Sequence, residues 1–150
     1  MSEQYLALIP AAGVGSRAKL KMAKQFTAIG SKTIIEYALD PFLLDDNCKK
    51  ICVVTQEDNE AWTSLSISGH EKIVSCIGGD TRMESVLKGL EMLMESEDKG
   101  SLVAIHDAAR PCLSNEDLKK IMDFANEEMK DEGQGVFLAH QPSELSLIHI

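Results

Sequence analysis

The stretch PAAGVGSRAKLKMAKQ, residues 10–25, combines small residues with basic side chains in a pattern that favours anion binding. No Asp or Glu lies between Gln4 and Ile35, and the basic residues of that interval are Arg17, Lys19, Lys21, Lys24 and Lys32. Small residues let backbone N–H groups approach a polyphosphate closely, and the cations would neutralise its charge. The sequence therefore predicts that this stretch binds a small anion. The alternative is a tight turn flanked by ordinary surface lysines.

A second stretch that could do chemistry is GGDTRMES, residues 78–85. Its two glycines free the backbone, and Asp80 or Thr81 can cap a helix that follows. Backbone groups and the hydroxyl of Ser85 could then hydrogen-bond the edge of a nucleobase. The alternative is a well-capped connection between a strand and a helix.

The third stretch is HDAARPC, residues 106–112, in which Asp107 stands near Arg110 at the end of an apolar run. A protein usually holds Mg²⁺ with one or two carboxylates together with substrate phosphates, because this ion keeps most of its waters. Asp107 is therefore a candidate magnesium ligand. The alternative is a structural ion pair between Asp107 and Arg110.

The elements that must position these stretches follow from hydrophobic patterning. Continuous apolar runs predict strands at 5–10, 49–56, 71–78, 101–109 (running into a loop) and 135–140. Amphipathic patterns predict helices at 33–46, 82–97 and 114–132, the first interrupted at Asp40–Pro41 because proline disrupts a helix interior. Strands of this kind alternating with helices indicate an α/β fold, with a mostly parallel sheet and helices on both faces. Ligands bind such sheets at the carboxyl ends of the strands, where the three stretches would meet.

Two helix faces and one cap can also be predicted from spacing. Ser114 and Asp117 form a plausible capping pair for the helix at 114–132. The buried face of the helix at 82–97 is predicted to carry Met83, Val86, Leu87, Leu90 and Leu93. The buried face of the helix at 114–132 is predicted to carry Leu118, Ile121, Met122, Ala125 and Met129.

Composition narrows the class of protein. A chain of 150 residues with 44% apolar and 26% charged residues is ordinary for one soluble domain. A formal net charge of −9 argues against nucleic acid as the main partner. No apolar run approaches the ~20 residues needed to cross a bilayer, and the N-terminus does not resemble a signal peptide, so we expect no membrane association and a cytoplasmic location. Cys52 and Cys76 lie in apolar runs and are expected to be buried thiols.

Taken together, PAAGVGSR with Lys24–Gln25, GGDTRMES and HDAARPCL resemble the 2-C-methyl-D-erythritol 4-phosphate cytidylyltransferases. The resemblance runs from Leu6 to about Ser143, in the same order and with similar spacing. It implies a Rossmann-like nucleotidyltransferase fold and transfer of a cytidylyl group from CTP to a sugar-alcohol phosphate in isoprenoid precursor synthesis, with Mg²⁺ as cofactor and a homodimer as the full-length form. The related ribitol-5-phosphate cytidylyltransferases, uridylyl- or guanylyltransferases and a catalytically silent nucleotide-binding module remain alternatives.

The resemblance also implies roles for individual residues. The loop around the triphosphate of CTP would contain Ala11, Ala12, Gly13 and Gly15. Arg17 and Lys24 would stabilise the transition state. The positions that read cytosine would be Gly79, Asp80 and Ser85. Asp107 would be the magnesium carboxylate, with Arg110 beside it.

The sequence departs from the family pattern at two positions and near its end. Ala23 stands where the family usually has Pro, and Ala18 where Met is common. After Ser143 the family's sugar-phosphate and dimer segments are not recognisable, and LSLIHI resembles the translation of a sequencing adapter. We therefore expect residues 1–144 to be the nucleotide-binding part of a single cytidylyltransferase domain, incomplete at the C-terminus, and 145–150 to be a non-native tail.

Overall fold

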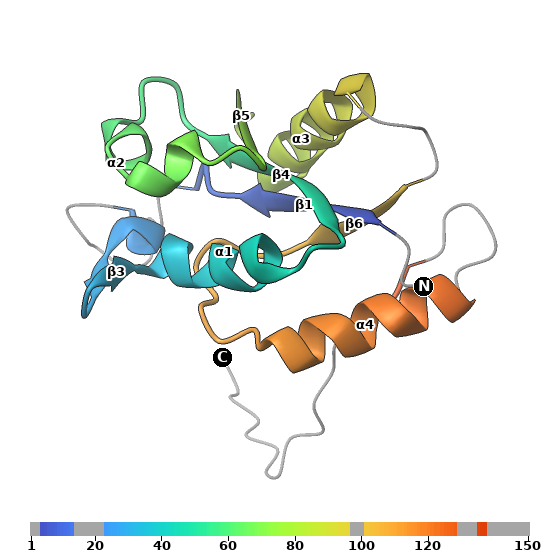
Figure 1. Cartoon of the computed structure of the whole chain (residues 1–150). Coiled ribbons are helices and arrows are strands. Elements are labelled where there is room, and N and C mark those ends of the chain that lie inside the picture. The colour runs from blue at the N-terminus through green and yellow to red at the C-terminus, as the bar shows by residue number, and fades with distance from the viewer. Residues whose placement is uncertain (1–3, 14–22, 97–100, 129–134, 138–150) are drawn as a thin grey trace, which may run out of the picture.

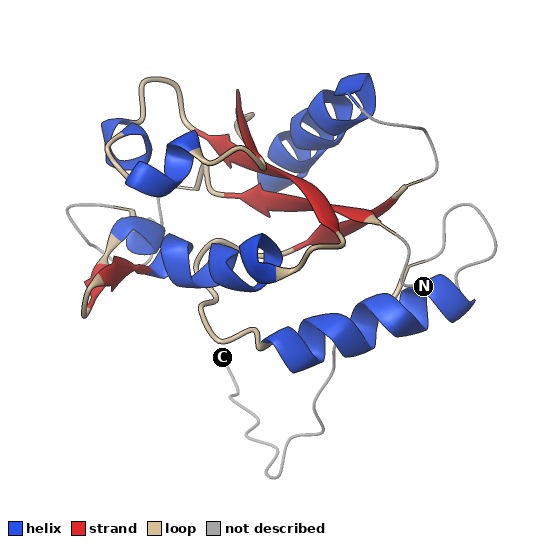
Figure 2. Ribbon diagram, in the orientation of Figure 1, coloured by secondary structure: helices blue, strands red, loops and turns tan. Residues whose placement is uncertain are grey.

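The core of the molecule is a four-stranded parallel sheet (Figures 1 and 2). The computed structural model describes residues 4–13, 23–96, 101–128 and 135–137. The strands are β1 (Tyr5–Pro10), β4 (Cys48–Thr55), β5 (Ile73–Ile77) and β6 (Leu102–Ile105), in the spatial order β5-β4-β1-β6. A separate antiparallel pair is formed by β2 (Ala28–Ile29) and β3 (Lys32–Thr33).

Helices cover both faces of the sheet, as predicted. They are α1 (Ile34–Leu44), α2 (Glu60–Thr63), α3 (Arg82–Ser96) and α4 (Asn115–Glu128), with 3₁₀ turns η2 (Lys24–Phe26) and η3 (Ser66–Gly69). Buried residues of α1, α2 and α4 pack on one face, and α3 packs on the other. Figure 1 shows α1 and α3 on opposite sides of β1 and β4.

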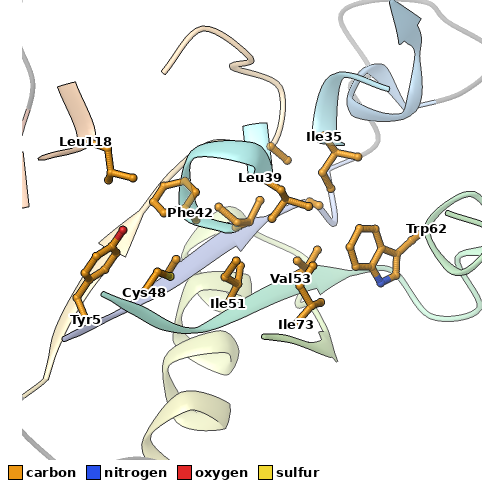
Figure 3. Packing of buried hydrophobic residues seen from close by; sticks show 14 of the residues in the cluster. Tyr5, Ile35, Leu39, Phe42, Cys48, Ile51, Val53, Trp62, Ile73 and Leu118 are labelled. Atoms are coloured by element: carbon orange, nitrogen blue, oxygen red, sulfur yellow. The ribbon is translucent and has the colours of Figure 1, made fainter. Parts of the chain in front are cut away.

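Strand β1 is a continuous apolar run because it is buried on both faces of the sheet. Tyr5, Ala7 and Ile9 point toward α1, and Leu6 and Leu8 point toward α3, because successive side chains of a strand face opposite sides. All five are buried. Figure 3 shows the α1 side, where Ile35, Leu39 and Phe42 meet residues of the sheet. Strands covered on both faces need apolar residues at every position.

The predicted interruption of the first helix at Asp40–Pro41 is wrong. Helix α1 runs through Pro41, after a capping box in which Glu36 accepts hydrogen bonds from the backbone N–H and hydroxyl of Thr33. Proline removes one backbone hydrogen bond near the end of this helix. The ring of Pro41 is buried, and this apolar burial offsets the lost bond.

The buried face of α3 includes Val86, Leu90 and Leu93 as predicted, but not Met83 and Leu87. Met83 and Leu87 are 79% and 55% exposed, whereas Leu93 is buried. A Cβ at Gly89 would lie 2.3 Å from Cδ1 of Leu8, so the helix approaches the sheet most closely at this glycine. The inward face therefore contains Val86, Gly89, Leu90 and Leu93. A pattern of apolar residues alone gives no weight to a glycine that the sheet contacts.

The second amphipathic helix agrees with its prediction. The hydroxyl of Ser114 accepts a hydrogen bond from the backbone N–H of Asp117, which confirms the cap. The buried face of α4 includes Leu118, Met122 and Ala125, with Ile121 packed beside them. Met129 lies outside the described residues. No helix in the described ranges has both the length and the apolar character to span a membrane.

The predicted strand at 135–140 is not found in its described part. Gly135, Val136 and Phe137 belong to no strand or helix, and 138–140 lie outside the described residues. A strand requires a hydrogen-bonded neighbour, and the described strands pair β6 with β1 alone. The other predicted strands are confirmed within two residues at each end, apart from the last, whose loop begins at His106.

The two cysteines expected to be buried lie side by side. Cys52 is fully buried on β4, Cys76 is half-buried on β5, and their Sγ atoms are 3.8 Å apart. Burial raises the pKa of both thiols, so both stay protonated near neutral pH. They therefore behave as small apolar side chains of the core.

Candidate active site at the carboxyl ends of the strands

The strand order reverses at β1, and open parallel sheets bind ligands beside such a reversal. The chain adds β4 and β5 on one side of β1 and then returns through α3 to add β6 on the other side. In open parallel sheets the crevice lies at the carboxyl ends of the strands where the order reverses in this way. The loop after β1 and the loop after β6 therefore border it.

Three loops begin at this edge: the first is residues 11–25 after β1, the second is 78–85 after β5 and includes the first turn of α3, and the third is 106–112 after β6. Backbone hydrogen bonds fix where each of them starts. The N–H of Ala11 donates to the carbonyl of Val54 at 2.7 Å, and the N–H of His106 donates to the carbonyl of Leu8 at 3.0 Å. The N–H of Gly78 donates to the carbonyl of Thr55 at 2.8 Å. The structure thus brings the three sequence stretches to one edge, as predicted.

The first and second loops are in direct contact. A Cβ at Gly78 would lie 2.7 Å from the Cβ of Ala12 and 2.7 Å from Oγ of Ser85. Contacts this short leave no room for a side chain. Glycine at position 78 is therefore required by the close packing of the two loops.

In the first loop the described residues are Ala11, Ala12 and Gly13, followed after a gap by Ala23 and Lys24. The side-chain amide of Gln25 donates to the carbonyls of Ala11 and Gly13, at 2.6 and 3.0 Å. Lys24, at the start of η2, is exposed beside this buried contact. The remaining predicted residues of this loop, Gly15 and Arg17, lie outside the described residues, as does Ala18.

The second loop satisfies its polar groups internally. The hydroxyl of Ser85 accepts from the N–H of Gly79 at 3.1 Å and lies 3.0 Å from the carbonyl of Thr81, to which it donates. The carboxylate of Glu84 accepts from the N–H groups of Asp80 and Thr81. The hydroxyl of Thr81 caps α3 by accepting from the N–H of Glu84. Ser85 is 3% exposed, so its hydroxyl shapes the loop from inside.

In the third loop Asp107 lies between two arginines. Nη2 of Arg82 is 2.8 Å from Oδ1 of Asp107, and Nε of Arg110 is 3.0 Å from Oδ2. The hydrogen bond from Arg82, followed by that from Arg110, holds the pKa of Asp107 below its usual value, against the opposing effect of partial burial. The carboxylate is therefore ionised at neutral pH. Arg82 comes from the second loop, so this ion pair also joins the second loop to the third.

The side chain of His106 holds the backbone of the third loop and packs against a core aromatic ring. Nε2 of His106 is 2.9 Å from the carbonyl oxygen of Arg110, and its ring lies 5.7 Å from the ring of Phe42. A cavity of about 920 Å³ runs past this loop, lined by Arg82, Asp107 and Arg110 and by apolar residues of β6 and α4. This volume lies within the usual range for small-molecule sites.

The carboxylate of Asp107 is a suitable ligand for Mg²⁺ that is also bound by substrate phosphates. An ionised carboxylate is a hard oxygen ligand, and magnesium sites often use one carboxylate with substrate phosphates. Across the described ranges, no three His, Cys, Asp or Glu side chains form a metal-binding cluster. Each carboxylate oxygen accepts one guanidinium hydrogen bond and keeps a second lone pair that a cation could use.

Sequence reasoning gave no role to three residues that build this site. They are Gln25, which holds the first loop; Arg82, which holds Asp107; and Lys88, whose Nζ donates to the carbonyl of Gly78 at 2.9 Å. The signal available for Arg82 was a cation inside a glycine-containing loop at the same sheet edge as Asp107. Gln25 gave no signal beyond its place next to Lys24.

Residues 5–140 match the sequence model of a protein family described as 2-C-methyl-D-erythritol 4-phosphate cytidylyltransferase. The chain is 38% identical over 141 residues to the protein of that name from Buchnera aphidicola, covering 94% of this chain and 56% of the relative. It is 36% identical over 139 residues to the protein of that name from Actinobacillus pleuropneumoniae serotype 5b, covering 93% and 57%.

A solved structure agrees with these sequence matches. The crystal structure of 2-C-methyl-D-erythritol 4-phosphate cytidylyltransferase from Francisella tularensis superposes with a TM-score of 0.66 at 30% identity, covering 87% of this chain and 54% of that one. The chain thus spans about half the length of the curated relatives and of this structure.

Proposed function

The chain belongs to the 2-C-methyl-D-erythritol 4-phosphate cytidylyltransferase family, and we propose that it carries the nucleotide-binding half of such an enzyme. The complete protein would transfer a cytidylyl group from CTP to 2-C-methyl-D-erythritol 4-phosphate and release pyrophosphate. The observation that carries the proposal is the meeting of the three loops at the carboxyl ends of β1, β5 and β6. Residues that bind the sugar phosphate would lie in the part of the relatives that this chain does not span.

The proposed reaction requires charge neutralisation more than covalent participation by the protein. A phosphate oxygen of the acceptor attacks the α-phosphorus of CTP, forming a new P–O bond while the bond to the bridging α,β-oxygen breaks and pyrophosphate leaves. Two anions approach each other, and further charge builds up at the five-coordinate phosphorus. Positioned cations therefore lower the barrier.

Lys24 and Arg17 are the proposed cations of this step. Lys24 offers a compact, exposed positive charge next to the first loop. Arg17 offers a planar fork that matches phosphate oxygens, and its role rests on the sequence alone. The small residues Ala11, Ala12 and Gly13 would let backbone N–H groups reach the triphosphate.

Asp107 is the residue that would hold Mg²⁺, which would polarise the α-phosphate when bound. Its two arginine partners would then be free to turn toward phosphate oxygens. In the second loop, the backbone around Gly79 and Asp80 would meet the cytosine, with Ser85 fixing the loop's shape from beneath.

Calorimetry and a product assay on the protein encoded by the complete reading frame test the proposal. We expect CTP to bind in the presence of Mg²⁺, and pyrophosphate to be released when 2-C-methyl-D-erythritol 4-phosphate is added. Release with ribitol 5-phosphate instead would assign the other acceptor. Binding of CTP without release with either acceptor would contradict the transfer activity and leave a nucleotide-binding module.

The role of Asp107 has its own test. Asp107→Asn keeps the size of the side chain and removes its negative charge, so the Mg²⁺ concentration needed for half-maximal turnover should rise by about tenfold or more. Isothermal titration of Mg²⁺ into the CTP complex provides a second readout. An unchanged metal titration in both measurements would remove Asp107 from the magnesium site.

The proposal extends to assembly and location. The family resemblance supports a homodimer in the cytoplasm. The mass of the complete protein in solution, measured by light scattering, tests the first point. A single-chain mass at the concentrations used for the assay would contradict it.

A further inference from the structure

Gln25 is a buried polar residue with a specific task in the first loop. Its side chain is 5% exposed, and Nε2 donates to the carbonyl oxygens of Ala11 and Gly13 at 2.6 and 3.0 Å. A side-chain amide carries two N–H donors, and both are used here. Because both partners are carbonyl oxygens, the nitrogen of the amide must face them, which fixes the orientation of the side chain.

The neighbours of Gln25 make this contact rigid. Phe26, the next residue, is 5% exposed and belongs to the main hydrophobic cluster. The N–H of Phe26 donates to the carbonyl of Ala23, which closes the short turn η2. Gln25 therefore reaches the first loop from a turn that is anchored in the core, with Lys24 on its exposed side.

Peptide geometry determines what this contact does to the loop. The C=O of one residue and the N–H of the next point in opposite directions, because the trans peptide is planar. When the carbonyl of Ala11 points at Gln25, the N–H of Ala12 points away from it. A Cβ built on Gly13 would meet no atom of the described residues within 4 Å.

We propose that Gln25 is a positioning residue for the polyphosphate of the bound nucleotide. It turns loop carbonyls inward and so presents backbone N–H groups to the ligand. Carbonyl oxygens that faced the bound nucleotide would repel its phosphate oxygens. The loop would then have to reorganise on binding, at a cost in binding free energy. This inference rests on the proposed function, and it adds a residue outside the set that contacts the nucleotide.

The test compares Gln25→Met with the unaltered complete protein. Methionine has similar length and no N–H donors, so the two carbonyls lose their partner. We expect the dissociation constants of CTP and inorganic pyrophosphate, measured by calorimetry with Mg²⁺, to rise by about tenfold or more. The dissociation constant of CMP, which lacks the outer phosphates, should change much less. Gln25→Asn, whose amide is too short to reach both carbonyls, should give an intermediate loss and decides the question if the Met variant does not fold.

Tyr5→Phe is the matched control. It removes another hydrogen bond of a buried side chain, from the Tyr5 hydroxyl to Asp45 at 2.8 Å. Tyr5 is the first residue of β1 and so lies at the end of that strand away from the first loop. The substitution should lower the melting temperature without raising the dissociation constant of CTP. Equal CTP affinity in a folded Gln25→Met protein, or an equal loss in Tyr5→Phe, would overturn the role of Gln25 alone. If the unaltered protein bound no CTP, the proposed function would fail together with this inference.

Discussion

The second and third loops contribute to the site in opposite ways. In the second loop, Ser85 and Glu84 satisfy backbone groups of the same loop, and Ser85 is almost completely buried. In the third loop, Asp107 is paired with Arg82 and Arg110, whose side chains are 64% and 76% exposed. The second loop is held by hydrogen bonds within itself, and the third loop by ion pairs at the surface.

This difference suggests that the contacts of the second loop serve stability and the charges of the third loop serve the reaction. Removing one partner of a buried hydrogen bond leaves a desolvated polar group, which costs about 1–3 kcal/mol. Exposed ion pairs contribute about 0–1 kcal/mol, because water and salt screen them. The buried contacts therefore give the site a fixed shape. The exposed charges can exchange one partner for another, as phosphate and Mg²⁺ would require.

Lys24→Ala should have the largest effect and should affect turnover alone. Lys24 is exposed, so its removal should leave the melting temperature nearly unchanged. Turnover of the complete enzyme should fall by roughly 10²–10³, the usual loss for one preorganised charge stabiliser. Lys120→Ala, which removes an exposed lysine paired with Glu116 on α4, is the control and should retain full turnover. Near-normal turnover in Lys24→Ala would take this cation out of the reaction.

The sheet and the position of the site could be predicted because they depend on local pattern and on one topological rule. The apolar runs of β1 and β4 reflect burial on both faces, whereas β5 and β6 at the edges of the sheet are only partly buried. Once the strands are parallel, their carboxyl ends share one edge, and the three loops must meet there. Loops rich in glycine and charge were therefore assigned to the correct edge without knowledge of any contact.

What could not be predicted depends on contacts between distant residues. Arg82 and Asp107 are 25 positions apart, and Gln25 and Ala11 are 14 apart, so no spacing within a single element reveals either pair. Met83 and Leu87 were wrongly assigned to the buried face of α3, because the helix packs on Leu8 through Gly89, which the apolar pattern does not count. The continuation of α1 through Pro41 similarly depends on burial in the tertiary structure.

Ser85→Ala should have an intermediate effect, on stability. The N–H of Gly79 would lose its acceptor in a buried place, so the free energy of unfolding should fall by about 1–2 kcal/mol. Ser68→Ala is the control, since the Ser68 hydroxyl donates to the carbonyl of Leu65 in the half-buried turn η3. Its cost in urea unfolding should be smaller. If Ser85→Ala weakened cytosine recognition without a loss of stability, the loop would not depend on this internal contact.

Arg82→Gln should have a smaller effect on stability than Ser85→Ala and a clear effect on the pKa of Asp107. The guanidinium favours the ionised carboxylate, so its removal should raise this pKa toward its ordinary value, as measured from the carboxyl carbon shift of Asp107 by NMR. Arg110→Gln should raise it less, because the hydrogen bond from Arg82 is the larger cause.

Since the folded state lowers the pKa of Asp107, the ion pairs stabilise the fold above the unfolded pKa and lose that contribution as the pH falls through the acid range. At neutral pH the free energy of unfolding should change by less than about 1 kcal/mol, because the pair is exposed. A larger loss would mean that the third loop, like the second, is held for stability, and the contrast between the two loops would disappear.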